Sequence, residues 1–203
     1  TFVGNGSQII YGSATSSLVG GLGGPTSATA RMYVNAGGVA ISAMIGENGS
    51  GVLNSGALAS NTNVVMGQNI GGSLTVSGGA SAVSGIYGYN QFQNPPADDI
   101  AYASVTILAG GSDKYSQLVG GASLNVSGGI SISSTLTGIF INDGQGYRSS
   151  TLTVSNSGTA SSTVVNGQAL LNVSANGSAV NAAINSGGVE TVYGGGIDIN
   201  ARI

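Results

Sequence analysis

The feature that most constrains the fold is a short phrase that recurs through the whole chain. Nine aliphatic residues stand in nearly the same local context, which reads TLTVSNSGTA, LLNVSANGSA and VETVYGGGID at the last three. These reference residues are Ile10, Val34, Leu53, Val76, Ile107, Val126, Val154, Val173 and Val192. Their numbers give the period, because four of the eight steps between them equal 19 and the other four equal 19 plus an insertion of 5, 4, 12 or 9. A fixed period with local insertions is typical of a solenoid whose turns carry loops.

Each repeat contains a strand pattern. An apolar residue stands two positions before the reference residue in six of the nine repeats, with Gln8, Gly51 and Glu190 as the exceptions. This spacing puts both side chains on one face of a β-strand. The six apolar residues are Met32, Leu74, Val105, Leu124, Leu152 and Leu171. Glycine follows within a few residues in nearly every repeat, which predicts a tight turn after the strand.

Two further columns complete the repeat. Six positions after the reference residue comes a column of small or apolar residues: Ala40, Ala59, Ala82, Ile132, Ala160 and Ala179. Ser16, Asp113 and Asp198 interrupt this column. Eleven positions after it comes an aliphatic column: Ile45, Val64, Leu118, Val165, Ile184 and Ile203. Each repeat therefore predicts a strand, a glycine turn, a short strand and a second turn.

Stacking such repeats buries a continuous apolar column, and it pairs each strand with its counterpart in the next repeat. We therefore predict an all-β fold, a right-handed parallel β-helix (β-solenoid) of about nine rungs that forms a single domain over residues 1–203. At about 4.8 Å per rung the rod is roughly 43 Å long. The right-handedness follows the general rule for parallel crossovers.

Other repeat folds match the sequence less well. A calcium-binding β-roll needs repeated GGxGxDxUx motifs, and GGGIDI at residues 194–199 is one partial match. A helical array conflicts with the abundance of glycine and β-branched residues. A β-sandwich has no strict 19-residue period.

Composition excludes several functions. Only 5% of the residues are charged and the net charge is −3, so the chain has no basic surface for nucleic acid. No apolar run is long enough for a membrane-spanning helix, so we predict no membrane insertion by this segment. Cysteine and histidine are absent, which removes disulfides and the commonest metal ligands. From the first and last residues we expect an excised or mature piece of a longer chain.

The insertions hold most of the chemically distinctive side chains. They lie near residues 20–26, 84–102 and 138–150. The two longer ones carry aromatic rings beside charged groups, and rings of this kind suit contact with sugars or proteins. The predicted binding residues are Tyr87, Tyr89, Phe92, Asp98, Asp99, Tyr102, Phe140, Asp143, Tyr147 and Arg148. The alternative is that these rings pack on each other and hold the loops down. Both long loops leave at a similar point of the repeat, two rungs apart, so we expect them to lie side by side.

Catalysis is not expected. Asp98, Asp99 and Asp143 are candidates for a carboxylate pair in glycoside hydrolysis, yet the chain has only seven acidic and four basic residues. We predict no catalytic residues, no metal site and no cofactor. The remaining surface is rich in Ser, Thr and Asn. It is either an uncharged soluble face with asparagine ladders, or a surface for glycans and for like-to-like contact.

The phrases VNAGGVA (34–40), TLTVSNSGTASSTVVNGQ (151–168) and NAAINSGGVETVYGGG (181–196) resemble the repeats of AIDA-type autotransporter adhesins of Gram-negative bacteria. The likeness covers nearly the whole chain outside the insertions. It implies a parallel β-helical passenger at the cell surface or outside the cell, active in aggregation, biofilm formation or host attachment as a virulence factor. It also implies self-association, or protein and glycan partners, and a glycosyltransferase that modifies serine and makes a glycoprotein. The aromatic insertions and the scarcity of charge depart from the family.

These observations lead to three functional hypotheses. The first is an adhesin that displays a stiff rod with two loops, and whose many weak contacts add up. The second is a structural filament subunit that assembles through the open strand edges at its ends. The third is a polysaccharide-degrading β-helix enzyme or tailspike.

Overall fold

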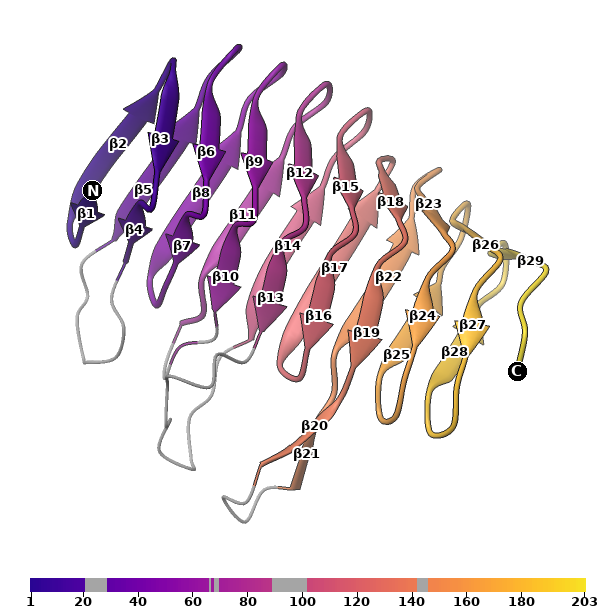
Figure 1. The fold of residues 1–203 in the computed structure, drawn as a ribbon. Coiled ribbons are helices and arrows are strands. Elements are labelled where there is room, and N and C mark those ends of the chain that lie inside the picture. Colours follow the sequence, from indigo (N-terminus) through magenta and orange to yellow (C-terminus); the bar gives the residue numbers. More distant parts are fainter. Residues whose placement is uncertain (21–28, 66, 68–69, 89–101, 142–145) are drawn as a thin grey trace.

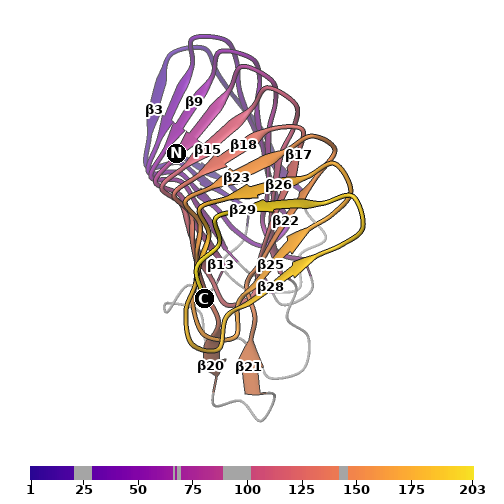
Figure 2. The ribbon, with the colours of Figure 1, turned by 90° about the vertical axis from the view of Figure 1, so that its right-hand side faces the viewer.

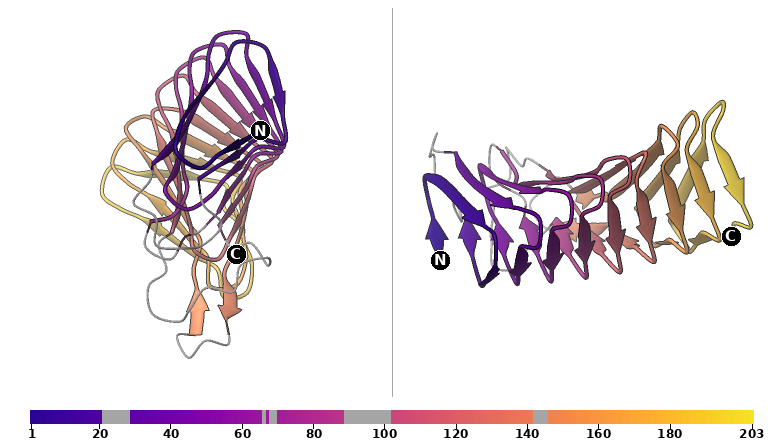
Figure 3. Two further views of the ribbon diagram at one scale, coloured as in Figure 1. Left: turned by 90° about the vertical axis from the view of Figure 1, so that its left-hand side faces the viewer. Right: turned by 90° about the horizontal axis from the view of Figure 1, so that it is seen from above.

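The molecule is a rod of three parallel β-sheets that wind around one core (Figure 1). The computed structural model describes residues 1–20, 29–65, 67, 70–88, 102–141 and 146–203. Each coil contributes one strand to each sheet, and the two ends of the chain lie at opposite ends of the rod. The coils wind right-handedly along the axis (Figure 3). The predicted right-handed parallel β-helix is confirmed.

Each sheet has nine strands in chain order. Sheet A contains β1 (Phe2–Val3), β4 (Leu18–Val19), β7 (Met44–Ile45), β10 (Asn63–Val65), β13 (Ile86–Gly88), β16 (Gln117–Val119), β19 (Thr135–Thr137), β24 (Val164–Val165) and β27 (Ala183–Ile184). Sheet B contains β2 (Gly6–Ile10), β5 (Ala30–Val34), β8 (Gly49–Leu53), β11 (Ser73–Val76), β14 (Ala103–Ile107), β17 (Ala122–Ser127), β22 (Thr151–Ser155), β25 (Leu170–Val173) and β28 (Val189–Val192). Sheet C contains β3 (Ser13–Thr15), β6 (Val39–Ile41), β9 (Leu58–Ser60), β12 (Ser81–Val83), β15 (Ser112–Lys114), β18 (Ile130–Ile132), β23 (Thr159–Ser161), β26 (Ser178–Val180) and β29 (Ile197–Ile199). An antiparallel hairpin, β20 (Ile139–Ile141) with β21 (Gly146–Arg148), stands outside the three sheets.

The reference residues of the repeat form one row of sheet B. From Ile10 to Val192, each is the register partner of the next. Strands of sheet B alternate buried and less buried residues, so this row and the one two residues earlier face inward. The inward rows of all three sheets form one hydrophobic cluster. Because side chains alternate with period two, a slip of one residue would expose the whole row, and the repeat therefore fixes the register.

Two positions of the small-residue column differ from the sequence prediction. Ala14 occupies this inward row of sheet C where Ser16 was expected, and Ser131 occupies it where Ile132 was expected. The reason is the turn from sheet B to sheet C. It has two residues after Ile10 and three after Val126, against four in a regular repeat.

The corner between sheets C and A has one left-handed residue in every rung. Its φ lies between 52° and 61°, and the residue is a serine or asparagine in eight of the nine rungs. Tyr115 is the exception. A single left-handed residue redirects the chain without ending the coil, and successive coils fan out about this corner (Figure 2). Asparagine tolerates this conformation better than most side chains.

Candidate functional site: the loop-bearing edge and the outer face of sheet B

All the long insertions leave the rod at the corner where the chain passes from sheet A to sheet B. They fall between β4 and β5, β10 and β11, β13 and β14, and β19 and β22. The hairpin β20–β21 extends from this edge (Figure 1). At the other two corners, all within the described residues, the connections have at most four residues. The expectation that the loops leave at a similar point of the repeat is met, and they share one edge of the rod.

Several predicted binding residues lie outside the described residues: Tyr89, Phe92, Asp98, Asp99 and Asp143. Tyr102 directly precedes β14 and is 51% exposed. Tyr147 lies in β21 and is 59% exposed, next to Arg148. Phe140 lies in β20 opposite Tyr147, and its side chain is outside the described part. The base of the long loop and the hairpin thus each present one exposed tyrosine.

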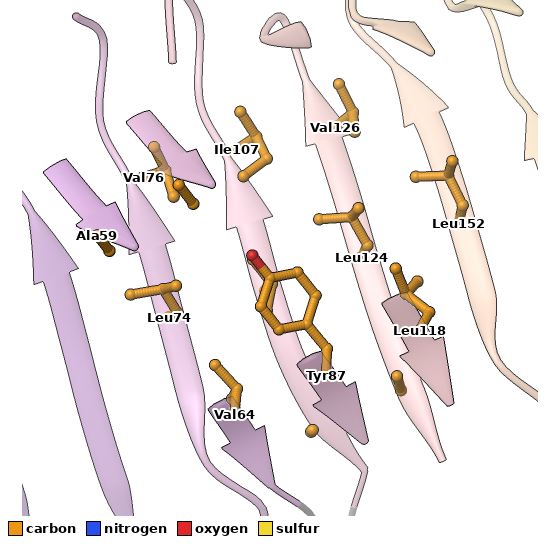
Figure 4. Close-up of a cluster of buried hydrophobic side chains, with 14 of the residues drawn as sticks. Ala59, Val64, Leu74, Val76, Tyr87, Ile107, Leu118, Leu124, Val126 and Leu152 are labelled. Carbon is orange, nitrogen blue, oxygen red and sulfur yellow. The ribbon is translucent and has the colours of Figure 1, made fainter. Parts of the chain in front are cut away.

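Tyr87 is not a loop residue. It lies in β13, in register with Val64 and Leu118, and its side chain is fully buried. Figure 4 shows its ring among the aliphatic side chains of neighbouring rungs. The insertion expected at 84–102 therefore begins only after Gly88, and Tyr87 cannot contact a ligand from this position. The sequence contains the signal, since Tyr87 stands eleven positions after Val76, in the aliphatic column.

Gly85 makes room for the tyrosine ring. A Cβ atom at this glycine would lie 2.4 Å from Cε1 and 2.5 Å from the hydroxyl oxygen of Tyr87. In other rungs the equivalent inward position holds a small side chain, such as Ala43, Thr62 or Ala182. The absence of a side chain at Gly85 therefore lets a large aromatic ring enter a column otherwise filled by Val, Ile and Leu.

The hydroxyl of Tyr87 belongs to a buried polar cluster. It donates a hydrogen bond of 2.8 Å to Oδ1 of Asp113, which interrupts the small-residue column of sheet C. Ser116 donates to the same oxygen, and Ser134 donates to Oδ2 over 3.2 Å. The hydroxyls of Ser134 and Ser131 are 2.8 Å apart. All five side chains are buried, so this cluster, which sequence reasoning missed, belongs to the core and not to a surface site.

Burial dominates the titration of the cluster. It raises the pKa of the Asp113 carboxyl above its ordinary value, and the hydrogen bonds from Ser116 and Tyr87 oppose the rise. Burial also raises the pKa of Tyr87 well above 10, and the negative charge of Asp113 adds to this. The carboxyl has several donors around it, as a buried charge requires.

The outer face of sheet B carries two rows of polar side chains. One row lies three positions before the reference residue: Ser7, Arg31, Ser50, Ser73, Ser104, Ser123 and Thr151 in the first seven rungs. The other lies one position before it, and between β11 and β25 it reads Thr75, Thr106, Asn125, Thr153 and Asn172. Arg31 is the one charged outward residue in the described strands of this sheet. Over its middle rungs the face is a ladder of hydroxyl and amide groups with almost no charge, whereas the outward residues toward its two ends include Ile9, Tyr33, Val52, Leu170 and Val189.

The described residues show no arrangement for metal chemistry. No group of three or more His, Cys, Asp or Glu that could hold an ion occurs in this part of the chain. Burial raises the pKa of Glu190 at the last rung, and the nearby charge of Asp198 raises it further. The three acids considered for glycoside hydrolysis all lie outside the described residues. Within those residues, no helix is long and apolar enough to cross a membrane.

Comparison with known proteins shows the fold. No protein-family model matches the sequence, and no curated protein matches it. Among solved structures, the chain is similar to the crystal structure of a hyper-glycosylated TibA fragment, residues 55–350, whose glycosylation is catalysed by TibC. The TM-score is 0.52 and the identity 18%, and the match covers 100% of this chain and 80% of that one. At this identity, the likeness establishes a shared β-helical architecture along the whole of this chain.

Proposed function

We propose that this chain is the displayed rod of a bacterial surface adhesin, which promotes aggregation, biofilm formation or attachment to host glycans. The observation that carries the proposal is that every long insertion leaves the rod from one edge, the corner between sheets A and B. Loops on a common edge can engage one partner surface together, whereas loops distributed around a rod cannot.

The resemblance of the repeats to AIDA-type autotransporter adhesins supports this function, and so does the fold shared with the TibA fragment. The near absence of charge also matters. With a net charge of −3 over 203 residues, two such rods repel each other weakly. Many weak polar contacts, repeated over many copies on a surface, then add up by multivalency.

The test compares beads that carry the wild-type chain with beads that carry two loop variants. In one variant a short Gly-Ser linker replaces residues 89–101, so that β13 and the buried Tyr87 remain. In the other, a two-residue turn replaces the hairpin β20–β21. The matched control changes the opposite corner, where the turn 155–158 (SNSG) takes the sequence of the turn 174–177 (SANG).

We expect wild-type and control beads to cluster in light scattering, and each loop variant to cluster less. Circular dichroism checks that all four proteins retain the β-helix. Equal clustering by all four proteins would refute the role of the loop-bearing edge. Long fibres formed by all four proteins in electron microscopy would favour the filament hypothesis instead.

A Ser-modifying glycosyltransferase is a proposed partner. The support is the resemblance to the adhesin family, together with the hyper-glycosylated state of the TibA fragment. Co-expression of the chain with such an enzyme, followed by intact-mass measurement, tests this. Mass additions in sugar units located on serine are expected, and an unchanged mass would contradict the proposal.

A further inference from the structure

The outer face of sheet B is hollowed near the loop-bearing edge. An open groove of about 470 Å³ lies there, within the size range of ligand sites. Its lining includes Arg31, Ser50, Ser73, Ser104, Tyr102 and Ile70. These residues are contributed by four consecutive rungs and by the segments that lead into β11 and β14. The groove therefore exists only because the coils are stacked.

Four of the lining residues form one straight row. Arg31, Ser50, Ser73 and Ser104 are successive register partners in β5, β8, β11 and β14. At about 4.8 Å per rung, the row runs for roughly 14 Å along the rod axis. One polar group per rung is a spacing close to the length of one pyranose unit in an extended polysaccharide.

The described lining of the groove carries one charged side chain, and that charge is positive. Arg31 is one of only four Lys and Arg residues in the chain. Within the described residues it is exposed, it has no hydrogen-bond or ion-pair partner, and no carboxylate lines the groove. Its planar guanidinium can hold a carboxylate through two parallel hydrogen bonds. This end of the groove is therefore complementary to an anionic group.

The remaining lining suits a sugar ring. Tyr102 and Ile70 are 51% and 58% exposed, and they supply an aromatic and an aliphatic surface beside the serine row. Among the described residues, the hydroxyls of Ser50 and Ser104 have no protein partner, and Ser73 makes only a 3.4 Å hydrogen bond to the carbonyl oxygen of Gly49. An aromatic surface, free hydroxyls and one fixed charge are together the groups that bind an acidic carbohydrate.

We infer that this groove binds a carboxylated oligosaccharide that lies along the rod axis. Its carboxylate pairs with Arg31, its hydroxyls bond to the serine row, and one ring packs on Tyr102. This inference deepens the proposed adhesive function by naming the ligand class, and it rests on that function.

The experiment is calorimetric titration of the purified chain with tetragalacturonate. The comparison ligand is the same tetrasaccharide with its carboxylates methyl-esterified, which keeps the shape and removes the charge. The variants are Arg31→Gln and Tyr102→Ala. Arg202→Gln is the matched control, because Arg202 lines a second groove, of about 700 Å³, with Asn181 and Asn200 but no aromatic ring.

We expect Arg31→Gln to weaken tetragalacturonate binding roughly tenfold to a hundredfold, since a charge-assisted bidentate contact is lost. Tyr102→Ala should weaken it several-fold to about tenfold. Arg202→Gln should leave it unchanged. The methyl ester should bind the wild-type chain as weakly as tetragalacturonate binds Arg31→Gln, and Arg31→Gln should not weaken the methyl ester further.

Three results would overturn the inference: undetectable binding of tetragalacturonate, equal affinity of the wild type and Arg31→Gln, or equal losses in Arg31→Gln and Arg202→Gln. Equal affinity for a sulfated tetrasaccharide without carboxylates would overturn the carboxylate assignment. The bead-clustering test with the wild-type chain separates a failure of this inference from a failure of the proposed function. If tetragalacturonate does not bind but wild-type beads cluster, the groove assignment fails and the adhesive function stands.

Discussion

The contact between Tyr87 and Asp113 provides a quantitative test of the buried cluster. The change Tyr87→Phe keeps the ring and removes the hydroxyl that donates to Oδ1 of Asp113 over 2.8 Å. Ser116 and Ser134 still donate to the carboxylate, so it is only partly deprived of donors. A hydrogen bond to a charged group contributes about 1.5–3 kcal/mol, so we expect the free energy of unfolding to fall by about this amount.

The second arm of the test removes both partners. Asp113→Ala restores the alanine found at this position in most rungs, as at Ala82 and Ala160. The single variant Asp113→Ala leaves the Tyr87 hydroxyl with one hydrogen-bond partner, the hydroxyl of Ser116, whose Oγ lies 3.2 Å away. In the double variant both polar partners are gone, and such a replacement is often nearly neutral. We therefore expect the double variant to lose less stability than the sum of the two single changes, with a coupling of about 1–2 kcal/mol.

The assay is urea unfolding followed by circular dichroism, with amide hydrogen exchange in β13 and β15 as a local readout, because repeat proteins can open rung by rung. Additive losses, with no coupling between the two changes, would refute the reasoning. That result would mean that the hydrogen bond from Tyr87 to Asp113 contributes nothing to the free energy of unfolding.

Three further predictions concern the same region. Gly85→Ala should destabilise the rod by about 1–3 kcal/mol in urea unfolding, because the new Cβ overlaps the Tyr87 ring; in a Tyr87→Leu background the same change should cost much less, and an equal cost in both backgrounds would contradict the account of Gly85. Tyr115→Asn should stabilise the chain by about 0.5–1 kcal/mol, since a tyrosine with φ of 58° is strained where asparagine is tolerated, and a lower melting temperature would count against this. Burial raises the pKa of the Asp113 carboxyl, so the native state binds this proton more tightly than the unfolded state does. The resulting contribution to the free energy of unfolding is complete below pH 3.8, and it is lost as the pH rises through the native pKa. Asp113→Asn should therefore reduce the fall in the free energy of unfolding above pH 3.8, and an unchanged pH profile would show that another group causes that fall.

The sequence by itself determined the solenoid. The reference residues recur with a period that fits a β-solenoid better than a β-roll, a helical array or a β-sandwich, and parallel stacking pairs each of them with the next. The insertions were visible as additions to the period, and their common position in the repeat predicted a common edge. These features could be predicted because rung-to-rung contacts join equivalent positions, so the periodicity itself encodes the tertiary neighbours.

The tertiary structure decided what depends on contacts between different columns or between rungs that are not equivalent. The position of Tyr87 in the aliphatic column indicated the core, but the space left by Gly85 and the hydrogen bond to Asp113, which let the ring enter it, are not visible in a periodic pattern. The Arg31 groove likewise combines side chains of four rungs with the exposed ring of Tyr102 at the base of a loop. Turn lengths that differ by one or two residues shifted Ser131 and Ala14 into the core. The physical reason is that hydrophobic periodicity fixes the register along a sheet, whereas polar clusters and grooves arise from packing between sheets, which a single repeat does not specify.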